Sequence, residues 1–426
     1  MLAKWQTFWR SLGPGILFAS TAIGVSHLVQ ATRAGADYGM ALLWAVVLAN
    51  LFKYPFFEYG SRYASAAGES LIDGYRRQGK AMLWLYFLVT LGSMFFVTAA
   101  VGAVTSGFMY NLFQLEGLLN PLSTTCLLFS ICVGILMWGQ YKVLDRLIKV
   151  IGSVLLFATL FAFVMTLLKG PASDPFRWFE PAVLVPGGKD FAFLIALMGW
   201  MPTAVELSAW NSLWTLERHR AIGAKPPLRE TLREFNFGYL ASALLAPCFL
   251  VLGAFLLYGT GRVMPEGSAA FASGIVQLYA ESIGPWSRWF IAAAAFSIMF
   301  GTCIAVFDGY ARSTERVFEL LRKDWSARFR ERDDRLQNRR EYNWSLALVA
   351  IGALVIVIPF GASLKALVDL ATSISFLIAP VIAIANFRLV SSRRLPADAR
   401  PGKFMRTLSY LGIAFLSGFA LLYLWG

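Results

Sequence analysis

The fold of this chain is decided by residues 13–36, which read GPGILFASTAIGVSHLVQATRAGA. This run is apolar over the length of a helix, and Gly24 interrupts it close to Ser26 and His27. A second apolar run is interrupted at residues 199–202, which read GWMP. Proline removes a backbone donor and clashes with the preceding turn, and glycine allows the chain to leave helical geometry. Both runs therefore predict helices that unwind near their middle.

The composition places these two runs in a membrane. Of the 426 residues, 58% are apolar and 15% are charged, whereas a soluble protein carries roughly 25% charged residues. Apolar runs such as 153–168 and 286–304 approach the length of about 20 residues that one helical crossing needs. They are too long and continuous for the strands of a barrel, and only helices or closed barrels satisfy their backbone in lipid. The sequence predicts an all-α integral membrane protein.

Eleven spans are predicted, and the charges of the loops orient them. The loops after the even-numbered spans are basic, and ten lysines or arginines fall between residues 312 and 340. Cytoplasmic loops carry an excess of such residues, so the N-terminus is predicted to be cytoplasmic and the C-terminus outside. The predicted spans are residues 13–34, 38–66, 81–112, 121–139, 144–168, 191–213, 237–261, 286–310, 344–360, 364–389 and 405–425.

The two interruptions lie in the first and sixth spans, an offset of five spans, so the second half is inverted relative to the first. This arrangement predicts a first repeat at 1–168, an extracellular loop at 169–190, a second repeat at 191–389 and a last helix at 390–426. Broken helices at matching positions of two repeats point to a binding site at the midplane, because their backbone groups must be satisfied there. Ordinary kinks are the alternative interpretation.

At these residues the chain resembles the NRAMP family, the divalent-metal/proton symporters with a LeuT-like fold. The resemblance covers most of the chain, and it is clearest from residue 13 to residue 36 and again at 42–51. The Met201–Pro202 pair of the sixth span also matches the family. The resemblance implies a 5+5 inverted repeat with unwound helices one and six, and transport of a solute across the membrane.

The family's chemical motifs match much less well. Its first helix carries Asp-Pro-Gly-Asn at the break, and these positions fall on residues 24–27. The metal-binding aspartate thus becomes Gly24, and the asparagine becomes His27. In the third helix, the family's proton-path acids fall in residues 96–102, which contain no ionisable group. The resemblance therefore implies the family's fold without its acidic residues.

In the sixth helix the family carries Ala-x-x-Met-Pro-His. The methionine is retained as Met201, the histidine becomes Thr203, and a second family histidine falls at Ser208. A polar position of the tenth helix falls near Ser373. Hard divalent ions prefer carboxylate and carbonyl oxygen, and an unpaired divalent charge in a membrane costs several kcal/mol. The sequence therefore predicts that this member does not carry Mn²⁺.

The remaining polar and soft groups at the breaks define the predicted site. We expect them to hold a small, amino-acid-like organic solute, with its carboxylate at a half-helix N-terminus and its ammonium near carbonyls or Glu206. The predicted substrate-binding residues are Thr21, Gly24, Ser26, His27, Met198, Trp200, Met201, Thr203, Glu206 and Ser373.

Two other interpretations stay open. His27, Met198 and Met201 could form a soft site for a Cu(I)-like ion. A non-transporting sensor is the second alternative. Neither His-Glu-x-x-His nor Gly-x-Ser-x-Gly occurs in the sequence, so no enzymatic activity and no cofactor are predicted.

Ionisable residues inside the spans also lead to predictions, because such residues are costly and usually functional. We expect His27 and Glu206 to form a coupled pair that exchanges a proton. Glu58 with Arg62, and Asp308 with Arg312, are predicted to be structural pairs. For Asp369 a functional and a solvated role are equally compatible with the sequence.

The basic residues sit between spans, which indicates orientation in a bilayer and excludes nucleic acid as a partner. The expected partners are the lipid bilayer and a small solute or ion. The chain is expected to work as a single copy in a bacterial inner (plasma) membrane.

Overall fold

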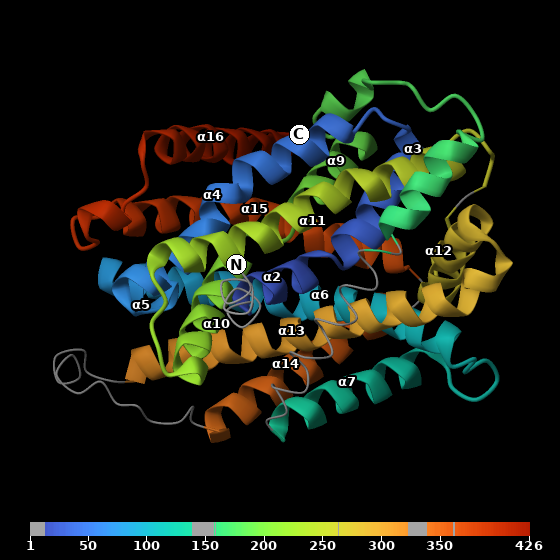
Figure 1. Ribbon diagram of the computed structural model, residues 1–426. Coiled ribbons are helices and arrows are strands. Elements are labelled where there is room, and N and C mark those ends of the chain that lie inside the picture. The colour runs from blue at the N-terminus through green and yellow to red at the C-terminus, as the bar shows by residue number, and fades with distance from the viewer. Residues whose placement is uncertain (1–12, 139–156, 158, 263, 323–338, 361–362) are drawn as a thin grey trace, which may run out of the picture.

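The computed structural model describes residues 13–138, 157, 159–262, 264–322, 339–360 and 363–426, and the described part consists of helices and connecting loops, without strands (Figure 1). The elements follow the order α2 (Pro14–Ala22), η1 (Ser26–Ala31), α3 (Thr32–Tyr38), α4 (Leu43–Ala67), α5 (Leu71–Gln78), α6 (Lys80–Leu112), α7 (Pro121–Met137), η2 (Pro181–Leu184), α9 (Lys189–Gly199), α10 (Leu207–Ile222), α11 (Leu228–Leu256), α12 (Ser268–Ile283), η3 (Pro285–Ser287), α13 (Arg288–Arg322), α14 (Arg339–Phe360), α15 (Leu364–Ser391), η4 (Ala397–Ala399) and α16 (Lys403–Trp425).

Seven helical segments of the described part are long and apolar enough to cross a membrane. They correspond to predicted spans one, three, seven, eight, nine, ten and eleven. The sixth span is divided between α9 and α10, and the fourth, α7, is only 17 residues long. The predicted fifth span lies partly outside the described residues, and its end forms a helix at Thr159–Lys169.

The second span, α4, is long enough but less apolar than the others. It is 25 residues long and carries Lys53, Glu58 and Arg62 in its interior. Glu58 and Arg62 pair with each other, with Nη2 and Oε1 2.5 Å apart, which confirms the predicted structural pair. Paired charges can be buried in a membrane helix at reduced cost. The charges therefore lower the hydropathy of α4 without removing it from the bundle.

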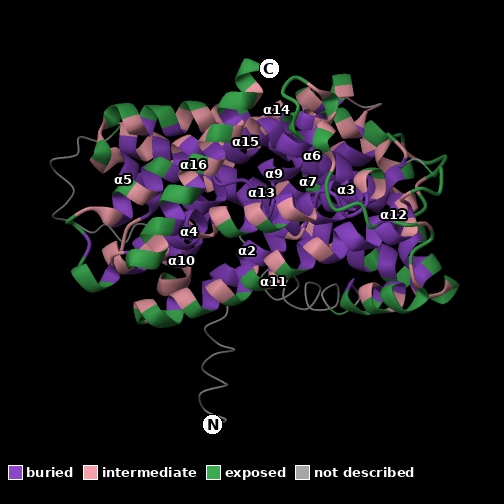
Figure 2. Cartoon of the chain, turned by 90° about the horizontal axis from the view of Figure 1, so that it is seen from above, coloured by how far each residue is buried: buried purple, intermediate pink, exposed green. Residues whose placement is uncertain are grey.

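The first span lies innermost in the bundle, while the ninth and eleventh spans lie at its edge. In the most apolar part of Pro14–Tyr38, 83% of the residues are buried. In the most apolar parts of α14 and α16, 28% of the residues are buried. Figure 2 shows buried residues in the middle of the bundle and exposed residues along its outside. The exposed side chains of α14 include Trp344 and Ile351, which are apolar and suit contact with lipid. The broken first span is therefore surrounded by protein.

Close backbone contact holds the first span against α11. A Cβ atom at Gly35 would lie 1.9 Å from the carbonyl oxygen of Leu250, and one at Gly238 would lie 2.0 Å from that of Gly15. Small residues allow membrane helices to approach this closely. At its N-terminal end, the carboxylate of Glu234 accepts hydrogen bonds from the N–H groups of Gly13 and Gly15, both at 2.8 Å. Glu234 thereby satisfies donors that every helix start leaves free.

The two ends of the described chain lie at opposite ends of the bundle. Gly13 lies against Arg218 and Glu234, in the segment that joins the sixth and seventh spans. Gly426 lies against Gly187, in the segment between the fifth and sixth spans. An odd number of crossings requires this placement. The short helices α5 and α12 also lie at opposite ends of the bundle (Figures 1 and 2), as their positions in an even and an odd loop require.

Candidate functional site

The first span unwinds at Gly24, as predicted. Helix α2 ends at Ala22, and a π-helical segment, η1, begins at Ser26. Because the N–H of Gly24 bonds to the carbonyl of Ala22 at 2.9 Å, the carbonyl of Ser20 loses its helical partner. The Thr302 hydroxyl of α13 donates a hydrogen bond to this carbonyl at 2.9 Å. A neutral side chain from a neighbouring helix therefore gives a hydrogen bond to the carbonyl group that the break leaves without a helical partner.

The same threonine fills the space beside Gly24. A Cβ atom at Gly24 would lie 2.9 Å from both Cγ2 and Oγ1 of Thr302, closer than real side chains come. The position that the resemblance assigns to a metal-binding aspartate thus has no carboxylate, and a side chain there would require Thr302 to shift.

The sixth span is broken between Gly199, where α9 ends, and Leu207, where α10 begins. Lys53 of α4 reaches this break, and its Nζ lies 2.6 Å from the carbonyl oxygen of Met198 and 2.7 Å from that of Gly199. A third carbonyl oxygen, that of Thr203, lies at 3.3 Å. Lys53 is completely buried. The amino group of Lys53 therefore caps the carbonyl end of the half-helix.

Lys53 is not among the site residues predicted from the sequence. The available signal was a lysine in the interior of an apolar span, because charges in that position are costly and usually functional.

His27 has protein partners on both of its ring nitrogens. Nε2 lies 2.9 Å from the carbonyl oxygen of Ser242 on α11, so this nitrogen is the donor, and Nδ1 lies 2.7 Å from the hydroxyl of Ser26. The ring edge packs on Phe249, and the side chain is fully buried. The hydroxyl of Thr21 donates to its own helix at Leu17. These predicted residues lie together at the first break, and their polar groups are bonded within the protein.

The predicted residues of the sixth span lie beside α15. The indole N–H of Trp200 donates to the Ser375 hydroxyl at 2.9 Å. Met198 and Met201 are completely buried, and Thr203 and Ser373 are buried with 7% exposure each. A Cβ atom at Gly199 would lie 2.0 Å from the carbonyl oxygen of Thr372, so α9 and α15 touch at the break. The predicted Ser373 of the tenth span therefore lies on the helix that contacts this break.

Glu206 makes its contacts on another side of the site. Its carboxylate accepts a hydrogen bond from the Tyr310 hydroxyl at 2.6 Å and another from the Ser93 hydroxyl at 2.9 Å. These partners lie on α13 and α6, whereas His27 bonds to α11. The structure thus gives the two members of the predicted proton-exchanging pair separate partners, and it does not bring them into contact.

A charged cluster joins the first and tenth spans. The guanidinium of Arg33 donates to both carboxylate oxygens of Asp369, at 2.7 and 3.1 Å, and also to the side-chain oxygen of Gln30 at 2.9 Å. The Gln30 amide donates to the same carboxylate at 2.9 Å. Arg33 also lies over the ring of Phe193, with 4.9 Å to the centroid. Asp369, whose role the sequence left open, is therefore paired.

The predicted pair of Asp308 and Arg312 is confirmed, with Nε and Oδ2 2.7 Å apart. The Asp308 carboxylate also accepts hydrogen bonds from the indole N–H of Trp214 at 3.0 Å and from the Tyr342 hydroxyl at 2.7 Å. Three helices, α10, α13 and α14, thus meet at one buried carboxylate.

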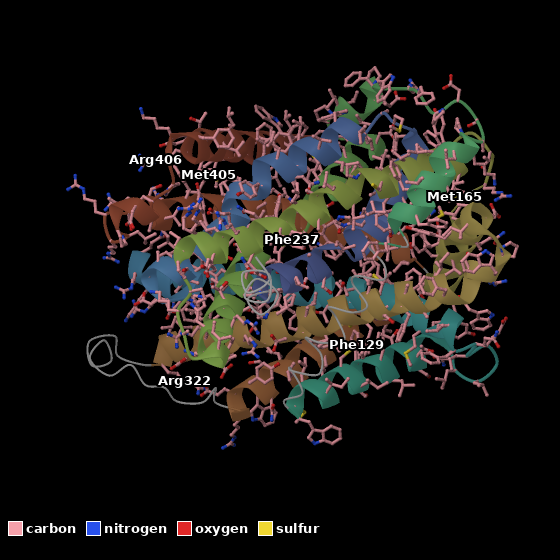
Figure 3. All side chains as sticks on the ribbon, viewed as in Figure 1. Phe129, Met165, Phe237, Arg322, Met405 and Arg406 are labelled. Atoms are coloured by element: carbon pink, nitrogen blue, oxygen red, sulfur yellow. The ribbon has the colours of Figure 1, made fainter. Side chains whose placement is uncertain are left out.

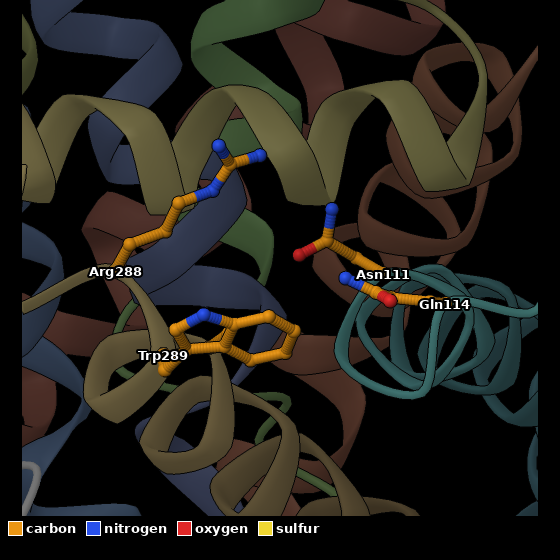
Figure 4. Close-up of a pocket in the computed structure, with 5 residues that line it drawn as sticks. Asn111, Gln114, Arg288 and Trp289 are labelled. Atoms are coloured by element: carbon orange, nitrogen blue, oxygen red, sulfur yellow. The ribbon is translucent and has the colours of Figure 1, made fainter.

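Side chains fill the spaces between the helices in Figure 3, where the labelled Arg322 and Arg406 lie toward the end that carries α5. The larger of two cavities described here has about 160 Å³, and Figure 4 shows Arg288 and Trp289 facing Asn111 and Gln114 across it. The second has about 60 Å³ and is lined in part by Ser106 and Thr125. Both lie away from the residues of the two breaks.

Comparisons with known proteins agree with this architecture. The model of the family described as natural resistance-associated macrophage protein-like matches residues 15–426. An uncharacterized protein of Pasteurella multocida is 33% identical, over 99% of this chain and 93% of that protein.

Solved structures share the fold at low sequence identity. The manganese transporter of Eremococcus coleocola, in complex with an aromatic bis-isothiourea substituted compound, has a TM-score of 0.70 at 13% identity, over 98% of this chain and 86% of that one. MhsT in complex with L-phenylalanine has a TM-score of 0.62 at 13% identity, over 96% and 97% of the two chains. The helical bundle with two broken spans is thus the LeuT-like fold.

Proposed function

This chain belongs to the NRAMP family of membrane transporters, and from that premise we propose that it carries a small organic solute in place of a divalent metal ion. The proposal concerns the substrate, since the family and the fold already identify a transporter. Among the structures with this fold, one is a manganese transporter and another is in complex with an amino acid. The fold therefore accommodates both classes, and the side chains at the breaks decide between them.

The observation that carries the proposal is the space beside Gly24. Thr302 occupies it, and a hard cation finds no carboxylate at the break of the first span. The acid of the sixth span, Glu206, is bonded to Tyr310 and Ser93. A divalent ion at the first break would have to lose its hydration without gaining a counter-charge there, which costs several kcal/mol.

The same groups suit an organic solute. Buried Met198, Trp200 and Met201 supply apolar walls, and Thr203 and Ser373 supply hydroxyls near them. Ligand sites for small molecules typically combine apolar walls with a few polar groups. A carboxylate of the solute would be favoured at the N-terminal end of a half-helix such as α10, where the partial charge is positive.

The soft-metal alternative receives less support. His27 would have to release Ser242 or Ser26 before either ring nitrogen could bind a metal ion. In the part of the chain that the structure describes, no three His, Cys, Asp or Glu side chains are grouped so that they could hold a metal ion.

We further propose the repeat boundaries 1–168 and 191–389, with a cytoplasmic N-terminus in the bacterial inner membrane and function as a single chain. Support for the orientation comes from the basic loops and from Arg322 and Arg406, which lie toward one end of the bundle (Figure 3).

A ligand screen on the purified protein tests the proposed substrate class. A compound that binds only the folded state stabilises it by about 2.7 kcal/mol at a concentration of 100 times its Kd. We expect an amino acid or small organic acid to raise the Tm, and Mn²⁺ and Cu(I) to leave it unchanged. Calorimetry with Mn²⁺ is the decisive control, because micromolar affinity for Mn²⁺ would overturn the proposal.

Restoring the missing carboxylate alone is expected to leave Mn²⁺ transport at background. In Gly24→Asp the new side chain meets Thr302, and the titratable groups of the family's proton path are still absent. Uptake of Mn²⁺ into liposomes measures the result. Gly24→Ala is the matched control, because it introduces the same contact with Thr302 without the charge. Its Mn²⁺ uptake should also stay at background, and it should be the more stable of the two variants because it buries no carboxylate. Proton-coupled Mn²⁺ uptake by Gly24→Asp would show that our account of the losses is wrong.

A further inference from the structure

Lys53 lies inside α4, and the partners of its ammonium group are backbone oxygens. Its three N–H donors face three carbonyl oxygens of the sixth span, those of Met198, Gly199 and Thr203, at 2.6, 2.7 and 3.3 Å. The side chain has no exposed surface. The arrangement is that of a cation in a cage of carbonyl groups.

The sequence of the break explains why these carbonyls are available. In a continuous helix the carbonyl of Met198 would accept from residue 202, which is a proline and has no N–H group, so this carbonyl keeps only local contacts with the N–H groups of Trp200 and, at 3.4 Å, Met201. The carbonyl of Gly199 loses its partner because α9 ends there. Carbonyls at a half-helix C-terminus carry a partial negative charge, and in transporters with broken helices such groups coordinate cations.

A charged side chain is not needed to give these carbonyl groups their hydrogen bonds. At the first break, the neutral hydroxyl of Thr302 satisfies the carbonyl of Ser20. A glutamine or serine could do the same at the sixth span with a smaller desolvation cost than an ammonium group. The nearby acid on the same helix, Glu58, is held by Arg62, and Glu206 is held by hydroxyl groups. The backbone dipoles, and not a carboxylate, therefore compensate the positive charge.

We propose that Lys53 is a tethered cation that permanently occupies a cation-binding position in the unwound sixth span. The chain then supplies from α4 the positive charge that a free ion would otherwise supply, and a second cation at these carbonyls is repelled. The inference deepens the proposed function at the same site, because it names a side chain that closes the break to metal ions. It also makes Lys53 a residue that determines specificity.

Removal of the side chain should convert the position into a site for a free cation. We expect Lys53→Ala to have a lower Tm than the parent, and propylammonium or butylammonium to restore much of the loss, with a saturable dependence on concentration. The parent should not respond to either compound. Ionic strength is held constant with N-methylglucamine chloride, so that a general effect of salt is excluded.

Phe56→Ala is the matched control on the same helix. It also opens a cavity at a completely buried position, but the removed ring carries no charge. Alkylammonium ions should therefore leave its Tm unchanged. Equal responses of Lys53→Ala and Phe56→Ala would show that the ions fill any cavity, and this outcome would overturn the proposal.

Lys53→Gln keeps the test available if the alanine variant does not fold. Glutamine is shorter and neutral, so the carbonyls keep a donor but lose the charge. We expect this variant to gain a rise in Tm with NH₄⁺, Na⁺ or K⁺ that the parent lacks. A variant as stable as the parent and insensitive to all three ions would make Lys53 an ordinary hydrogen-bond donor. These measurements need no transported solute, so Mn²⁺ binding by the parent would reject the proposed function without deciding this test.

Discussion

Replacing Asp308 with alanine is expected to lower the free energy of unfolding by about 3–5 kcal/mol, the usual cost of removing one partner of a buried ion pair. Asp308 is 3% exposed and holds Arg312 through two contacts of 2.8 and 2.7 Å. Without this carboxylate, the guanidinium loses its two short contacts, while Glu217 lies farther away, at 3.7 Å. The indole of Trp214 and the hydroxyl of Tyr342 lose their acceptor as well.

Thermal unfolding in detergent, followed by size-exclusion chromatography or fluorescence, measures this loss. Glu281→Ala is the matched control, because Glu281 pairs with Arg262 where both side chains are at least one-third exposed. Exposed pairs contribute about 0–1 kcal/mol, so its Tm should change little. If the two variants lost the same stability, the buried carboxylate would not join α10, α13 and α14 in the way that we describe.

Gly35→Ala is expected to destabilise the protein by about 3 kcal/mol, at the upper end of the usual cost of overpacking. The added Cβ would lie 1.9 Å from the carbonyl oxygen of Leu250 and 2.6 Å from the nitrogen of Ala254. Both are backbone atoms and cannot rotate away as a side chain can. The first span and α11 would have to separate, which opens contacts on both sides of the break.

The same substitution at Gly92 should have the opposite effect on stability. Gly92 is exposed within α6, and a Cβ there meets nothing within 4 Å. Alanine favours a helix over glycine by about 0.5–1 kcal/mol, so Gly92→Ala should be as stable as the parent or more stable. A drop in Tm for Gly92→Ala, or none for Gly35→Ala, would contradict the close helix contact.

The sequence was sufficient for the fold because the fold depends on local signals. Glycine and proline mark the two breaks near Gly24 and Gly199, and loop charge separates the spans. The short helix α5 also had a local signal that the sequence analysis did not use. Ser70 and Asp73 form a capping box at its start, which is a readable helix signal.

The candidate site was less predictable, because its chemistry depends on which helices face each other. Lys53 lies 145 positions from its partner Met198, and no spacing rule connects them. The direction in which the Glu206 side chain points depends on how the chain resumes its helix after the break. The hydroxyl groups that bond to its carboxylate come from α6 and α13. Thr302 likewise defines the space at Gly24 from a distant part of the chain.

The glycine contacts along α11 have a consequence for how the carrier exposes its site alternately to the two sides of the membrane. Both halves of the first span touch α11 backbone to backbone, at Gly15 with Gly238 and at Gly35 with Leu250. Sliding or tilting of either half alone would drive main-chain atoms into one another, because a closely packed interface cannot deform gradually. We therefore expect the first span and α11 to move together during the transport cycle.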